Sequence, residues 1–97
     1  MNTKYFIKKL HKDLSFESVR FYYEKKGWHV IFFTPGDPLV SRLGLSDKTA
    51  ENGFIFCDEF EKYIFINANL SAKEKRNTIF HEAGHIELNH DFSDLCS

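Results

Sequence analysis

The sequence has little of several features that mark particular classes of protein. Its 97 residues include only two cysteines, Cys57 and Cys96, which are too few for a disulfide scaffold and favour free thiols in a reducing compartment. No apolar run approaches the ~20 residues that a membrane-spanning helix needs. The first residues carry charges throughout and lack the apolar core of a secretory signal. We therefore expect a cytoplasmic protein that does not enter a membrane.

An excess of charge of one sign is also missing. Thirteen Lys and Arg residues stand against 14 Asp and Glu residues, so the formal net charge is −1. Direct binding to nucleic acid needs a basic excess to contact phosphates. This composition therefore gives no reason to expect a nucleic-acid-binding protein.

The length allows one domain, which we assign to residues 1–97. Hydrophobic residues make up 42% of the chain and aromatic residues 16%, which is a globular composition. A chain of this size buries only about 60–65% of its unfolded surface, so its core is small. We therefore expect a bound metal, a partner or a missing segment to add stability.

The first half of the chain is expected to contain one helix and one strand. Ser15 precedes the apolar positions of residues 16–23, and Gly27 follows them, as at the two ends of a helix. Residues 28–33 are aromatic and β-branched, which is typical of a strand, and a Pro-Gly-Asp-Pro turn follows them. Residues 39–52 are expected to form an irregular connection.

The second half is expected to contain a β-hairpin and a long helix. Residues 53–57 and 62–67 are apolar runs separated by a short acidic turn, which predicts two antiparallel strands. Ser71 and Glu74 form a capping box that opens a helix running to about Leu88. The predicted fold class is α+β, with a three-stranded, largely antiparallel sheet packed against this last helix and the N-terminal helix.

The last helix carries the pattern HExxH, as His81-Glu82-Ala83-Gly84-His85. Residues four apart lie on one face of a helix, so the imidazoles of His81 and His85 can reach one zinc ion. Glu82 lies beside that position, where a carboxylate can take a proton from water as a general base. The apolar residues Ile79 and Ala83 define a different face, so we expect the histidines to point into a cleft.

A catalytic zinc ion usually takes a third protein ligand. His90 is a candidate if the helix ends near Leu88, with Asp91 and Asp94 as competitors. An exposed histidine at the helix end is the alternative interpretation of His90. Glu87 is expected to be a solvated helix charge, and Cys57 a thiol in the core.

The stretch Tyr63-Ile64-Phe65-Ile66-Asn67-Ala68-Asn69-Leu70-Ser71, followed by Arg76, Thr78 and the HExxH pattern, resembles the ImmA/IrrE family of zincin-like metallopeptidases. The resemblance implies a minimal zincin-like domain. It also implies a cytoplasmic zinc peptidase, of a kind often encoded by phages and integrative elements, that cleaves a helix-turn-helix repressor to relieve repression. Carried over by position, His81 and His85 would bind zinc, Glu82 would be the general base, and Asn67 and Thr78 would support the strand end and the helix face.

The sequence also departs from the family pattern. Family members usually continue into a further helix with an acidic third ligand, whereas this chain stops at Ser97. We expect that His90, Asp91 or Asp94 replaces that ligand, or that the domain is truncated, or that metal binding is weak and catalysis is lost. The alternative function is then a non-catalytic zincin-like module, such as an antirepressor or phage-type inhibitor that acts by occupancy.

Overall fold

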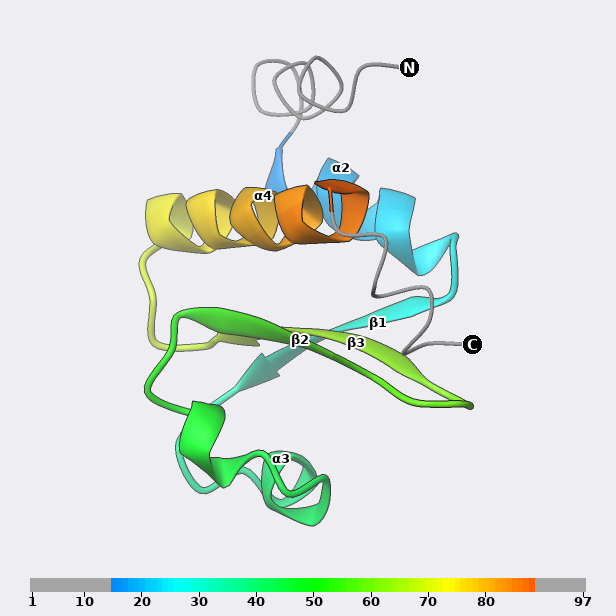
Figure 1. The fold of residues 1–97 in the computed structure, drawn as a ribbon. Coiled ribbons are helices and arrows are strands. Elements are labelled where there is room, and N and C mark those ends of the chain that lie inside the picture. Colours follow the sequence, from blue (N-terminus) through cyan, green and yellow to red (C-terminus); the bar gives the residue numbers. More distant parts are fainter. Residues whose placement is uncertain (1–14, 89–97) are drawn as a thin grey trace.

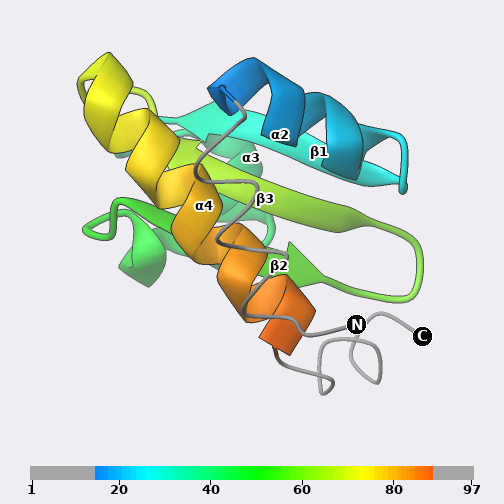
Figure 2. The ribbon, with the colours of Figure 1, turned by 90° about the horizontal axis from the view of Figure 1, so that it is seen from above.

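The computed structural model describes residues 15–88. Its elements in chain order are helix α2 (Phe16–Glu24), strand β1 (Trp28–Phe33), helix α3 (Pro38–Arg42), 3-10 helix η1 (Ser46–Lys48), strand β2 (Gly53–Cys57), strand β3 (Lys62–Asn67) and helix α4 (Ala72–Leu88). Helices α2 and α4 cover one face of the sheet, and α3 lies against the opposite face (Figure 1). Seen from above, α2 follows β1, while α4 crosses β3 and β2 (Figure 2). The predicted α+β class is confirmed.

Side-chain caps set the starts of the two long helices, as the sequence predicts. The Ser15 hydroxyl accepts a hydrogen bond from the Ser18 amide at 3.3 Å at the start of α2. The chain leaves this helix through Gly27, whose φ of 94° lies in the left-handed region that favours glycine. At the start of α4, Ser71 and Glu74 each accept a hydrogen bond from the other's backbone amide, both at 3.2 Å. The capping box is therefore confirmed.

The sheet has the strand order β1-β3-β2 and is mixed. Strands β2 and β3 pair antiparallel, with Phe54 opposite Phe65, so the predicted hairpin is confirmed. Strands β1 and β3 pair parallel, with Val30 opposite Ile64. The expectation of a largely antiparallel sheet is therefore corrected, because one of the two pairings is parallel. The chain crosses from β1 to the far edge before it turns back, so β3 enters between the two earlier strands.

The connection between β1 and β2 is more regular than expected. It contains α3 and η1 instead of an irregular loop. Asp37 caps α3 by accepting a hydrogen bond from the Leu39 amide at 2.9 Å, and Pro38 occupies its first position. Both are ordinary helix-start features. With only five residues, however, this helix is too short to show a hydrophobic period.

The sheet is packed on both faces. The larger apolar cluster fills the space between the sheet and helices α2 and α4, and consists of Val19, Tyr23, Trp28, Val30, Ile64, Ile66, Ile79, Phe80 and Ala83. The smaller cluster lies on the α3 side and consists of Phe33, Val40, Phe54 and Phe65. The rings of Phe54 and Phe65 stack there with centroids 4.8 Å apart. Helix α4 therefore packs on a sheet whose opposite face is also covered by buried apolar side chains.

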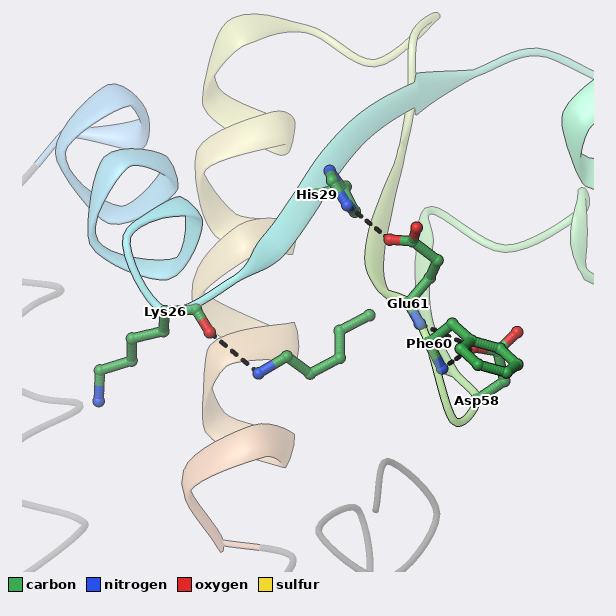
Figure 3. Close-up of polar contacts among 6 residues, drawn as sticks. Lys26, His29, Asp58, Phe60 and Glu61 are labelled. Carbon is green, nitrogen blue, oxygen red and sulfur yellow. Dashed lines mark hydrogen bonds and ion pairs between the residues drawn. The ribbon is translucent and has the colours of Figure 1, made fainter.

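The turn of the β2–β3 hairpin is held by polar contacts (Figure 3). Asp58 Oδ1 accepts hydrogen bonds from the amides of Phe60 at 2.8 Å and Glu61 at 2.7 Å. Glu61 in turn contacts His29 Nε2 at 2.7 Å, which ties the turn to β1. Phe60 is left 85% exposed at the tip.

Cys57, at the end of β2, differs from expectation. It takes part in a disulfide, so the expectation of a free thiol is wrong at this position. A count of cysteines does not show which thiols the fold brings together. Cys96 lies outside the described residues. None of the helices described over residues 15–88 is long and apolar enough to cross a membrane.

Candidate active site

The orientation of α4 separates its apolar residues from its histidines. Ile79 and Ala83 are fully buried in the core that α4 shares with the sheet. His81 and His85 lie on an exposed face of the same helix. The predicted separation of the two faces is confirmed, and it follows from the helical period.

The structure brings the imidazoles of His81 and His85 together. Their Nε2 atoms lie 3.0 Å apart, and the two rings meet edge to face with centroids 4.5 Å apart. Two ligands of a tetrahedral zinc ion at 2.0–2.1 Å would be about 3.3 Å apart. The observed separation is close to this value, so the pair fits two ligands of one zinc ion.

Glu82 occupies a different environment from the neighbouring histidine. It is only 6% exposed, yet it lines the same cleft as His81 and His85. Burial, followed by the negative charge of Glu51, raises the pKa of the Glu82 carboxyl to about 7. A carboxyl of this kind can exchange a proton near neutral pH.

The cleft has a volume of about 820 Å³ and two walls. One wall is a face of α4 and is formed by Glu74, Asn77, Thr78, His81, Glu82 and His85. The opposite wall is formed by the end of η1, the connection after it and the start of β2, namely Lys48, Glu51, Asn52, Gly53, Phe54 and Ile55. Because β2 pairs with β3 on one side only, the edge strand of the sheet borders the cleft.

Gly53 lets α4 approach this edge strand closely. A methyl group added at Gly53 would lie 2.5 Å from Thr78 Cγ2 and 2.8 Å from the backbone oxygen of Phe65. Thr78 is itself buried, at 7% exposure. The absence of a side chain at Gly53 therefore sets the distance between α4 and β2 at the cleft.

The cleft between α4 and the edge strand β2 thus contains the histidine pair and the buried carboxyl of Glu82, which is next to His81 in the sequence. The family model described as the IrrE N-terminal-like domain, of peptidase family M78, matches residues 23–94. The chain belongs to this family. Membership implies a zinc-dependent metallopeptidase. No curated protein and no solved structure matches the chain.

The described residues of this M78 domain do not add a third possible metal ligand to the histidine pair. Over residues 15–88, no group of three or more His, Cys, Asp or Glu side chains is placed to hold a metal ion. The candidates His90, Asp91 and Asp94 lie outside this range. Of the predicted site residues, the structure therefore places His81, Glu82 and His85, which all line the cleft.

Glu87 has a contact that the sequence did not indicate. Its Oε1 accepts a hydrogen bond of 2.9 Å from the hydroxyl of Tyr23, which is fully buried. The expectation that Glu87 is a solvated charge is therefore corrected. The two residues are 64 positions apart, and no pattern within the helix reveals such a partner.

Two supporting residues implied by the family resemblance can be placed. Thr78 lies in the cleft wall formed by α4, close to Gly53 of the edge strand. Asn67 Oδ1 accepts a hydrogen bond from the Asn69 amide at 2.9 Å, which shapes the turn between β3 and α4.

Proposed function

We propose that this protein is a zinc-dependent peptidase that cleaves a protein substrate, with helix-turn-helix transcriptional repressors as the substrate class. One observation carries the proposal. The Nε2 atoms of His81 and His85 lie 3.0 Å apart, in a cleft that Glu82 also lines. The repressor substrate follows from the family resemblance alone.

In this proposal His81 and His85 hold zinc through their Nε2 atoms. When bound, zinc supplies a Lewis acid that polarises the scissile carbonyl and makes a water molecule more acidic. Helix α4 holds the two imidazoles on one face, and its packing on the sheet keeps that face towards the cleft.

Glu82 acts as the general base. Its carboxylate takes a proton from the attacking water and then delivers it to the leaving amine of the cleaved peptide bond. Burial supports this role, because a proton acceptor shielded from bulk water stays aligned with the reacting groups. Thr78 and Gly53 set the depth at which the carboxylate sits, through the close contact of α4 with β2.

The edge strand β2 offers a way to bind the substrate. Its outer edge has no partner strand within the described sheet. A substrate segment in extended conformation would add to this edge through main-chain hydrogen bonds, as in other cases of strand addition. Since Gly53, Phe54 and Ile55 line the cleft, such a segment would pass the histidine pair.

The proposal is tested with zinc-loaded wild type and Glu82→Gln incubated with a purified helix-turn-helix repressor. We expect wild type to cleave the repressor and Glu82→Gln to lose cleavage at least 100-fold while it keeps the same zinc content. Glu59→Gln, at the exposed hairpin turn, is the matched control and should cleave like wild type. Undiminished cleavage by Glu82→Gln contradicts the assigned role.

A second function is that of a module without peptidase activity. Over residues 15–88, no third His, Cys, Asp or Glu side chain joins His81 and His85 in a group that could hold a metal ion. In this alternative the domain binds its partner without cutting it. Partner affinity and antirepressor activity would then survive in both Glu82→Gln and His81→Ala. Loss of antirepressor activity in both variants, with folding intact, would exclude the alternative.

A further inference from the structure

Two charged side chains on the wall opposite α4 have no part in the proposed chemistry. Lys48 ends η1, and Glu51 lies two residues before β2. The Glu51 amide donates a hydrogen bond of 3.0 Å to the Lys48 carbonyl, so one turn holds both residues at the rim of the cleft. Both side chains are exposed and line the cleft.

The two rim charges differ in their place along the cleft wall. Only Asn52 separates Glu51 from the edge strand β2, and both Asn52 and Gly53 line the cleft, whereas Lys48 belongs to η1. The other acidic residue of the cleft outside the HExxH pattern, Glu74, is held in the capping box by Ser71.

The Glu51 carboxylate is also available to a ligand. Among residues 15–88, no Lys, Arg or His side chain forms an ion pair with it. A negative group without a partner in a cleft attracts a positive group of a ligand, and a partly enclosed wall strengthens that attraction. The carboxylate therefore favours cationic over anionic side chains in a bound peptide.

We propose that Glu51 is a specificity-determining residue that favours a Lys or Arg side chain of the substrate at a fixed distance from the scissile bond. This inference rests on the proposed peptidase function. The distance is fixed because only Asn52 separates Glu51 from the edge strand β2, along which the peptide lies. We expect a preference of about two- to fivefold, which corresponds to about 0.4–1 kcal/mol and lies within the range for an exposed ion pair.

The first experiment measures cleavage of a degenerate peptide library by zinc-loaded protein, with the products sequenced by mass spectrometry. We expect Lys and Arg to be enriched about two- to fivefold at one position relative to the cut. Glu51→Gln should abolish this enrichment, and Glu51→Lys should replace it by a preference for Asp and Glu. Glu59→Gln changes charge equally outside the cleft and should keep the wild-type preference.

A second measurement does not depend on catalysis. Zinc-loaded Glu82→Gln is titrated with three fluorescent peptides that differ only in one central Lys, Gln or Glu. We expect the Lys peptide to bind about two- to fivefold more tightly than the Gln peptide at low salt, and the Glu peptide more weakly. The additional change Glu51→Gln should make the three affinities equal.

The two measurements distinguish the possible failures. Absence of any cleavage by wild type, with selective binding of the Lys peptide, overturns the peptidase function and leaves Glu51 as a binding determinant. Cleavage without a basic preference, or a preference that Glu51→Gln leaves unchanged, overturns the role of Glu51.

Discussion

The hydroxyl of Tyr23 donates a hydrogen bond of 2.9 Å to Glu87 Oε1 and so joins α2 to the last turns of α4. Tyr23 is fully buried, and its ring meets that of Tyr22 edge to face at 5.0 Å. Glu87 follows His85 by two residues. The contact therefore anchors the end of the helix that presents the histidine pair.

Tyr23→Phe should lower the free energy of unfolding by about 1–2 kcal/mol, because Glu87 loses its buried donor while the ring is retained. Chemical denaturation at pH 7 measures this loss. Glu87→Gln keeps an acceptor for the hydroxyl and should cost less. An equal loss in both variants would contradict a contact that a neutral acceptor can also make.

The same contact predicts a dependence of stability on high pH. Burial, and then the hydrogen bond to Glu87 and its negative charge, raise the pKa of Tyr23 well above its ordinary value of 10.0. Because the pKa is raised in the folded state, this contribution to stability is fully present below pH 10 and is lost as the pH rises further. The loss amounts to about 1.4 kcal/mol per pH unit.

Unfolding by denaturant between pH 9 and pH 12 measures this effect. Wild type should lose stability more steeply than Tyr23→Phe above pH 10, and the two curves should run parallel below it. Parallel curves over the whole range would contradict a buried, protonated Tyr23.

Gly53→Ala should destabilise the protein by about 2–3 kcal/mol, because the new methyl group meets Thr78 Cγ2 and the Phe65 backbone oxygen. Thr78→Ser removes only the first of these contacts. The double variant should therefore recover part of the loss in a thermal unfolding experiment. Full recovery would show that the backbone contact carries no cost, and Gly53→Ala with wild-type stability would contradict the close approach.

Glu82→Gln should stabilise the metal-free protein at neutral pH. The pKa of Glu82 is raised from 4.5 to about 7, so its contribution is present below pH 4.5 and is lost as the pH rises through 7. The difference between variant and wild type should grow over this range to about 2 kcal/mol, less than the full shift because the cleft admits water. Urea unfolding at pH 5 and pH 8, in the presence of a chelator, measures it. A difference independent of pH would contradict the raised pKa.

Zinc should raise the melting temperature of wild type, since binding to the folded state adds about 2.7 kcal/mol at a hundredfold excess over Kd. His81→Ala and His85→Ala should each lose this response, as measured by thermal unfolding with and without zinc. His29→Ala removes a histidine outside the cleft and should keep the response. An undiminished response in His81→Ala would place the metal elsewhere.

Local features of the sequence predicted the elements that form the cleft. The helical period separated Ile79 and Ala83 from the histidines, and the capping box of Ser71 and Glu74 located the start of α4. These patterns depend on residues within one turn of a helix, and for that reason a single sequence reveals them. The histidine pair likewise follows from the four-residue spacing alone.

Features that depend on contacts between distant residues were either not predicted from the sequence or predicted wrongly. The parallel pairing of β1 with β3 is decided by how the chain crosses the sheet, which no strand pattern encodes. The partner of Glu87 comes from the other end of the described chain. Glu51 lay in a segment expected to be irregular, and only the fold shows that this segment faces α4.

The parallel pair has a consequence for how the protein folds. Trp28 pairs with Lys62, so forming this pair closes a loop of more than thirty residues, an entropic cost that local hairpins avoid. The β2–β3 hairpin and α4 are built from contacts between nearby residues, whereas α3, η1 and the rim with Glu51 all lie within the loop that this pair closes. The wall that faces the histidines therefore belongs to a segment whose two ends are held together by β1 and β3, and we expect a change that weakens this pair to disturb the cleft as well.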